Sequence, residues 1–332
     1  SVAGVPSRQF QQIQQYQMIV SENPSATNQD KAELEEVLKG QEIQDYQKIY
    51  SKTLDKAFKG KAGLQTITLM MTEKEDLTPF IHLQHHQQDL TLKDGVVITA
   101  KLAQLAGVKV GQTLEIESKK LKVAAIAENY VGHFIYMSQA SYVQIYGQLP
   151  QANTYLVSLR DTSAPSIERQ AGLLMNQAAV SSVVQNTSAI RLFDSVASSL
   201  NQTMTILVIV SVLLAIVILY NLTNINVAER IRELSTIKVL GFHNNEVTLY
   251  IYRETIVLSL VGIVLGLVSG FYLHQFLIQM ISPATILFYP QVGWEVYVIP
   301  VAAVSIILTL LGFFVNHHLR KVDMLEALKS VE

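Results

Sequence analysis

The residues best suited to chemistry in the C-terminal half of the chain lie together in segment 221–254. The charged side chains at its centre are Glu229, Arg230, Arg232, Glu233 and Lys238. Residues 195–228 before this centre and residues 255–294 after the segment contain no Asp, Glu, Lys or Arg. Such side chains form ion pairs and charge-assisted hydrogen bonds. Segment 221–254 is therefore a candidate contact surface between two apolar stretches.

The same segment has the pattern of an amphipathic helix. One face is apolar (Val227, Ile231, Leu234) and the other is charged (Glu229, Arg232, Glu233). Gly241 is expected to end this helix in the left-handed conformation, and Phe242 follows directly. The preceding apolar helix is then expected to continue as one rigid rod to Gly241. By residue chemistry alone, the rod's end is equally a solvated surface or a docking site.

Metal, thiol and nucleotide chemistry find no support in the sequence. His82, His85 and His86 lack an H-E-x-x-H pattern and a carboxylate at ligand spacing, so no metal site is expected. The absence of cysteine excludes disulfides and thiolate catalysis. Gly60-Lys61-Ala62 lacks the upstream glycine and the hydroxyl residue of a phosphate-binding loop. No cofactor is therefore expected in this chain.

The composition divides the 332 residues into two halves. Charged residues make up only 16% of the chain, against roughly 25% in a soluble domain. The deficit lies almost entirely in residues 195–332, whereas residues 1–194 are polar. A net charge of −2 gives no general attraction to nucleic acid. A polar domain followed by a membrane domain accounts for this distribution better than one globular body.

The first half is expected to contain two parts. Residues 1–62 are rich in Gln and read as a polar helical extension, with helices from Asn28 to Leu38 and from Gln41 to Phe58. Residues 63–190 read as an extracytoplasmic α+β domain. Its expected strands are 64–71, 80–83, 96–99, 111–117, 121–126, 155–159 and 180–184, and its expected helices are 100–106 and 166–177.

Residues 191–332 read as an all-α transmembrane domain of three helices. The expected spans are 204–220, 255–278 and 296–315, and each approaches or exceeds the ~20 residues that cross a bilayer. Segment 221–254 and the C-terminal tail carry Lys and Arg, whereas loop 279–295 carries none. The positive-inside rule therefore places the segment and the C-terminus in the cytoplasm and the N-terminal domain outside a bacterial cell membrane.

The second membrane span has glycines at four-residue spacing, Gly262, Gly266 and Gly270. Helices in lipid associate through close backbone approach, so this stripe predicts a face for packing another helix.

The chain begins with Ser1, and its polar half precedes the first apolar run. Export of that half needs an upstream signal, so the sequence is expected to be a fragment that lacks an earlier membrane helix.

Residues Ala228 to Phe242, AERIRELSTIKVLGF, closely resemble the signature of the FtsX/MacB-like ABC transporter permeases. Glu254, the glycine-stepped helix and the final helix with its basic tail also match that pattern. The resemblance covers 195–332 strongly, 63–190 in layout, and not 1–58. Ser235 departs from it, because Gly or Ala is common there in the family.

The resemblance implies a permease subunit. A separate cytoplasmic ABC ATPase would bind the ATP and contact segment 221–254, and the external domain would change shape in response. Membrane lipids, a second permease unit or a homodimer, and an extracytoplasmic protein are the other expected partners. Export of a peptide, lipid or hydrophobic compound is the leading hypothesis.

Two alternatives remain open at this stage. The first is a mechanotransmitting regulator of a cell-wall hydrolase or sensor, without transport. The second is a membrane-anchored enzyme, which needs a catalytic cluster in 63–190 that the sequence does not reveal.

Overall fold

The computed structural model describes residues 5–58, 63–73, 77–85, 88–230, 233, 237, 240, 241, 243–281, 284–287 and 293–321. The chain divides into two compact units. We call the first the sheet domain, which comprises residues 1–198 and 281–289, and the second the helical domain, which comprises residues 199–280 and 290–332. The loop between the last two long helices thus belongs in part to the sheet domain.

The sheet domain is built on a nine-stranded mixed sheet with the order β11-β1-β10-β2-β3-β9-β6-β8-β7. Its strands are β1 (Met18–Glu22), β2 (Ile43–Ala57), β3 (Leu64–Thr72), β6 (Val96–Thr99), β7 (Thr113–Ile116), β8 (Lys119–Ala127), β9 (His133–Ser138), β10 (Thr154–Leu159) and β11 (Val180–Gln185). A separate ribbon pairs β4 (Gln84–His85) with β5 (Gln88–Asp89). The β3–β9 and β6–β8 pairs are parallel, and the others are antiparallel. The expected α+β class is confirmed.

Short helices complete the sheet domain. They are α1 (Val5–Ser7), the π-helix η1 (Arg8–Ile13), α2 (Asn28–Leu38), α3 (Ala100–Ala106), α4 (Gln139–Tyr146) and α5 (Ala164–Met175). Helix α2 begins with a capping box, in which the Thr27 hydroxyl accepts from the backbone N–H of Asp30 and the Asp30 carboxylate accepts from that of Thr27. Helix α3 ends at Ala106, as expected, and its C-cap Gly107 has φ of 66°, a left-handed conformation that glycine adopts without strain.

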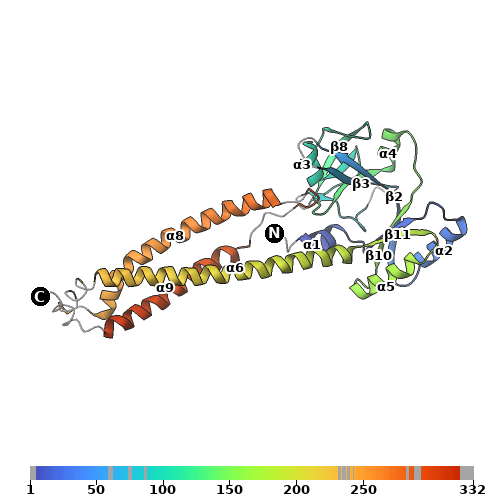
Figure 1. Cartoon of the computed structure of the whole chain (residues 1–332). Helices are drawn as coiled ribbons and strands as arrows, with labels where there is room; N and C mark the ends of the chain where they lie inside the picture. The colour runs from blue at the N-terminus through green and yellow to red at the C-terminus, as the bar shows by residue number, and fades with distance from the viewer. Residues whose placement is uncertain are drawn as a thin grey trace. The chain divides into compact units, whose positions relative to one another are not determined.

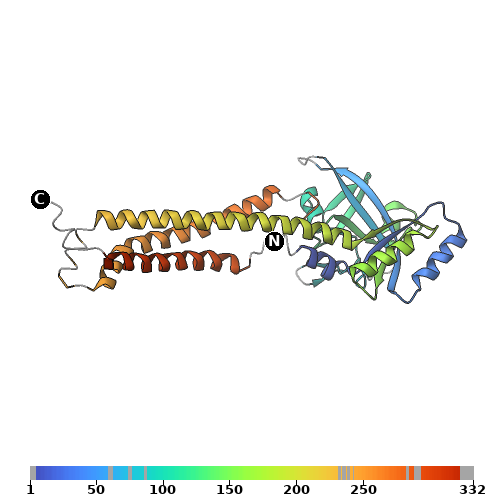
Figure 2. The same ribbon diagram turned by 60° about the horizontal axis from the view of Figure 1, so that its bottom comes forward.

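Strand β2 joins the two lobes of the sheet. Its first half pairs with β10, where Ile49 faces Thr154, and its second half pairs with β3, where Tyr50 faces Met71. Helices α2 and α5 lie by the lobe of β1, β10 and β11, and α3 and α4 lie by the other lobe (Figures 1 and 2). Separate apolar cores fill the two lobes. One long strand therefore belongs to both packing units.

The prediction of a separate helical extension over residues 1–62 is wrong, although its helix from Asn28 to Leu38 is confirmed as α2. The segment 41–58 forms β2 and not a helix, and β1 also inserts into the sheet. Its Ile and Tyr residues satisfy a helical spacing, but they are also strong strand formers, and β10 and β3 supply hydrogen-bond partners on either side. Tertiary pairing decided the outcome, so residue 62 is not a domain boundary.

A second local prediction is also wrong. Residues 80–83 were expected as a strand, but Phe80 lies in a turn and only an isolated bridge joins Ile81 to Gln14. The backbone N–H groups of Phe80 and Ile81 both bond to the carbonyl of Leu77, which closes that turn. The turn-forming Thr78-Pro79 pair explains why the apolar run does not extend.

The helical domain consists of three long helices. They are α6 (Asn186–Glu229), which begins in the sheet domain, α8 (Asn244–Ile281) and α9 (Glu295–Lys321). Each is long and apolar enough to cross a membrane. In the most apolar stretches of α6 and α8, no residue is buried within the protein. Apolar surface on this scale is stable only in lipid. The three predicted spans are confirmed.

Candidate coupling site

The charged centre of segment 221–254 begins where α6 ends. The helix stops at Glu229, and Arg230 lies in a turn, although no Pro or Gly occurs between Val227 and Leu240. Arg230 thus interrupts the predicted continuous rod, whereas Glu233 and Ile237 beyond it are helical as predicted, and the other residues from 231 to 239 lie outside the described residues. Tertiary contacts coincide with the stop, because Val227 is buried against the neighbouring helices and Arg230 pairs across to α8.

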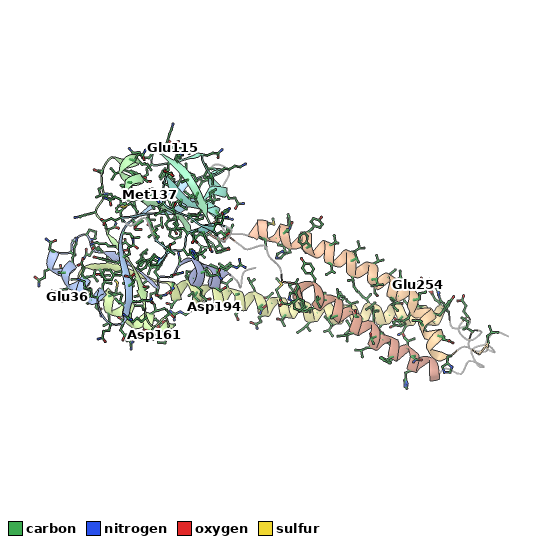
Figure 3. The ribbon with its side chains drawn as sticks, turned by 180° about the vertical axis from the view of Figure 1, so that it is seen from behind. Glu36, Glu115, Met137, Asp161, Asp194 and Glu254 are labelled. Atoms are coloured by element: carbon green, nitrogen blue, oxygen red, sulfur yellow. The ribbon has the colours of Figure 1, made fainter. Side chains whose placement is uncertain are left out.

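An ion pair closes this end of the helical domain. Arg230 Nη2 donates to Glu254 Oε2 at 2.8 Å, and it joins the end of α6 to α8. The Arg230 side chain is 38% exposed and that of Glu254 is 60% exposed. Figure 3 labels Glu254 on α8. The pair is therefore a partly solvated brace, and it fixes the end of α6 against α8 more than it stabilises the fold.

A small apolar cluster lies beneath the ion pair. Its buried members are Val227, Tyr252, Ile307, Leu311 and Val315, from all three long helices. The side chain of Tyr252 is 5% exposed, and its ring lies 3.8 Å from the position that a Cβ on Gly312 would take. The nearby hydroxyl residues Thr223 and Thr255 are also buried. Packing at this cluster holds α6, α8 and α9 together at the end that carries the charged segment.

The side chains available to a partner lie outside this cluster. Glu229 and Glu233 are exposed, and Leu240 is 72% exposed. Gly241 has φ of 94°, the left-handed conformation expected for it. Among the other predicted site residues, Arg232, Lys238 and Phe242 lie outside the described residues. The described part therefore presents acidic side chains beside an exposed leucine.

The start of α8 has its own cap. The backbone N–H of His243 donates to Glu246 Oε2 at 2.9 Å, and the N–H of Glu246 bonds back to the His243 carbonyl at 3.0 Å. This reciprocal arrangement satisfies donors that a helix start otherwise leaves open. It also makes α8 begin at a defined residue soon after Gly241. The cap by Glu246, the burial of Tyr252 and the pairing of Glu254 with Arg230 were not predicted from the sequence, although all three residues lie within segment 221–254.

The glycine stripe of α8 faces open space. A Cβ added at Gly262, Gly266 or Gly270 would meet no described atom within 4 Å. The three glycines line a groove of about 880 Å³ in the helical domain, together with Ser211 on α6 and Pro300 on α9. The face is flat and accessible, and its packing against another helix stays a prediction.

Comparisons with known proteins bear on the two domains separately. Residues 205–324 match the family model described as FtsX-like permease C-terminal. A comparison with curated proteins found no match. Among solved structures, the periplasmic region of MacB from Actinobacillus actinomycetemcomitans is 12% identical, with a TM-score of 0.32, and the match covers 55% of this chain and 94% of that one.

The extracellular domain of the noncanonic ABC-type transporter YknZ from Gram-positive bacteria is also similar. It is 14% identical, with a TM-score of 0.30, and the match covers 51% of this chain and 98% of that one. The family match falls on the three long helices and includes the whole of segment 221–254.

Proposed function

Because residues 205–324 are an FtsX-like permease C-terminal domain, we propose that the chain is the permease subunit of an ABC transporter whose ATPase is a separate chain. The ATPase contacts segment 221–254 through Glu229, Arg230, Arg232, Glu233 and Lys238, with Gly241 and Phe242 shaping the end of the contact. ATP hydrolysis there moves the long helices and so changes the shape of the sheet domain. The transported compound is a peptide, a lipid or another hydrophobic molecule.

The braced end of the helical domain is the observation that carries this proposal. A contact that transmits force must be exposed to the partner and also rigidly attached to the helices that move. Glu229 and Glu233 meet the first need, and the Arg230–Glu254 pair with the apolar cluster beneath it meets the second. A merely solvated helix end requires neither the ion pair nor a cluster shared by α6, α8 and α9.

The proposed orientation places this end in the cytoplasm and the sheet domain outside the cell. Its basis is the distribution of Lys and Arg, which are present in segment 221–254 and in the tail but absent from loop 279–295. A cysteine at Leu240, in a chain that has none of its own, provides the test. In intact cells an impermeant maleimide should leave it unlabelled and should label a cysteine at exposed Val184; labelling in the opposite sense contradicts this orientation.

Charge reversal tests the ATPase contact. The double variant Arg232→Glu/Glu233→Arg should abolish co-purification of the ATPase from membranes while the chain still inserts. The matched control is Glu35→Arg/Lys39→Glu, which exchanges two exposed charges near the end of α2 in the sheet domain and should leave co-purification unchanged. ATPase binding at the wild-type level in the first variant would show that segment 221–254 is not the contact.

A capture experiment separates export from regulation. The full chain, cross-linked in growing cells through surface residues of the sheet domain, should retain a lipid, peptide or other hydrophobic compound if it exports one. Capture of a cell-wall hydrolase or a sensor protein would instead assign the chain a regulatory role without transport.

A further inference from the structure

The loop between α8 and α9 is attached to the sheet domain by backbone hydrogen bonds. Ile286 and Val131 form an isolated antiparallel bridge. The N–H of Gly132 donates to the Thr285 carbonyl at 2.8 Å, and the N–H of Leu287 donates to the Tyr130 carbonyl at 2.9 Å. The loop thus pairs with the segment that leads directly into β9.

Two buried carboxamides hold the other side of that segment. Gln9 Oε1 accepts from the N–H of Tyr130 at 2.7 Å and from that of Val131 at 3.3 Å. Gln9 Nε2 donates to Asn129 Oδ1 at 2.8 Å. Asn129 Nδ2 donates to the carbonyls of Val131 at 2.7 Å and Gly132 at 3.1 Å. The Gln9 and Asn129 side chains are 0% and 1% exposed.

These bonds together satisfy every backbone N–H and C=O of Tyr130, Val131 and Gly132. The carboxamides take the N–H groups of Tyr130 and Val131 and the carbonyls of Val131 and Gly132. Only the Tyr130 carbonyl and the Gly132 N–H are left, and both bond to the loop. A buried backbone group without a partner is strongly unfavourable, so the carboxamides and the loop depend on each other for a complete network.

The backbone conformation of Gly132 allows its N–H to reach the loop. Its φ is 80°, a left-handed conformation that other residues adopt only with strain. A Cβ at this position would also lie 3.0 Å from the Phe134 ring. Glycine therefore lets the chain turn so that its N–H reaches Thr285 before β9 begins at His133.

One apolar core receives side chains from the α8–α9 loop, from the start of α6 and from α1. Leu287 from the loop and Phe193 from the start of α6 pack against it, and Val5 from α1 is buried within it. The same core contains Tyr130 and Tyr136, which lie in the bonded segment and in β9. Strand β9 lies inside the nine-stranded sheet, where it pairs with both β3 and β6. Movement of the loop therefore has a direct structural connection to the centre of the sheet.

We infer that segment 129–132 is a permanent junction that fixes the α8–α9 loop to the sheet domain, with Gln9 and Asn129 as its positioning residues. The attachment stands on the contacts above. Its use in carrying movement of α8 and α9 into β9 rests on the proposed permease function. The membrane helices then act on the sheet domain through this junction as well as through α6.

Disulfide cross-linking in the full chain tests the attachment. Val131 and Ile286 form a non-hydrogen-bonded antiparallel pair, for which the Cα–Cα distance is about 4.5 Å, within the range that a disulfide spans. The chain has no cysteine to interfere. In membranes treated with a mild oxidant, Val131→Cys/Ile286→Cys should lose its reactivity toward a polyethylene glycol maleimide. The control Val131→Cys/Val184→Cys should keep it, because Val184 lies on edge strand β11, five places from β9 in the sheet. Equal rates of loss of maleimide reactivity in the two cysteine pairs would overturn the attachment.

A third substitution, added to Val131→Cys/Ile286→Cys, tests whether Gln9 positions the junction. Gln9→Leu removes the acceptor for two buried N–H groups and should slow the Val131–Ile286 cross-link about tenfold, as expected when a hydrogen bond is lost. Gln12→Leu changes an exposed residue of the same π-helix and should have no effect. Leu287→Pro, which removes one donor of the bridge from the loop side, should also slow the cross-link and keeps the test valid if Gln9→Leu misfolds. Unchanged rates in Gln9→Leu and Leu287→Pro would overturn the inference.

The rate of ATP hydrolysis tests whether the junction is permanent. In membranes that also contain the ATPase, oxidised Val131→Cys/Ile286→Cys should hydrolyse ATP at the rate of the reduced protein, because a permanent contact never opens. A loss of more than half the activity on oxidation, absent from the single-cysteine variants, would overturn permanence. Failure of any ATPase to co-purify would count against the proposed function alone, since the cross-linking experiments need no ATPase.

Discussion

The Arg230–Glu254 pair allows a quantitative test of the braced end. Replacing Arg230 by Glu, Glu254 by Arg, and both together gives a double-mutant cycle that isolates the energy of the pair. With the side chains 38% and 60% exposed, solvent screens the charges, so we expect a coupling energy of about 0.2–1 kcal/mol. A buried pair would instead cost about 3–5 kcal/mol on removal of one partner.

The assay is thermal unfolding of the full chain in detergent at low salt. For a domain of this size, 1 kcal/mol shifts the melting temperature by roughly 2–4 °C, so each single variant should melt at most a few degrees lower. The exchanged variant should recover most of that loss, and 0.5 M salt should reduce the difference, because it screens the remaining charges. We expect ATPase co-purification to stay impaired in the exchanged variant, because Arg230 is also one of the proposed ATPase contacts.

Two results would refute this reasoning. A coupling energy of several kcal/mol would show that the pair is desolvated, contrary to its exposure. Recovery of ATPase co-purification together with the melting temperature would show that Arg230 acts only as a brace and does not contact the ATPase directly.

Two further predictions concern the sheet domain. Burial, and secondarily the Lys101 ammonium, lowers the pKa of the His133 imidazole below its usual value near 6.5. The unfolded state therefore takes up a proton that the folded state resists, so stability is fully present above about pH 6.5 and is lost as the pH falls toward the folded pKa. His133→Leu should reduce the dependence of the melting temperature on pH between pH 5 and 8. An unchanged dependence would contradict the role given to His133. Gly95→Ala should lower stability by about 1–3 kcal/mol, because φ is 147° and a Cβ would lie 2.5 Å from the Lys122 carbonyl oxygen. The control Gly172→Ala, in open space on α5, should raise stability by roughly 0.5–1 kcal/mol in the same denaturation assay.

The sequence alone determined the long helices and several short elements. Uninterrupted apolar runs without charge predict membrane spans because the bilayer demands about 20 apolar residues and an internally bonded backbone. Gly241 marked a left-handed position correctly, because glycine adopts that conformation without strain. Each of these signals is local, and neighbouring residues supply all the interactions it needs.

Tertiary structure alone decided the features that join remote parts of the chain. Strand β2 resembles a helix in its spacing until β10 and β3 supply its hydrogen-bond partners. Helix α6 ends at Glu229 without a stop signal, where Val227 packs and Arg230 meets Glu254. The Gln9–Asn129 junction is invisible in the sequence, because its residues are 120 positions apart and a Gln-rich stretch reads as solvent-exposed. A buried carboxamide is stable only when distant backbone groups complete its hydrogen bonds, and only the folded chain brings those groups together.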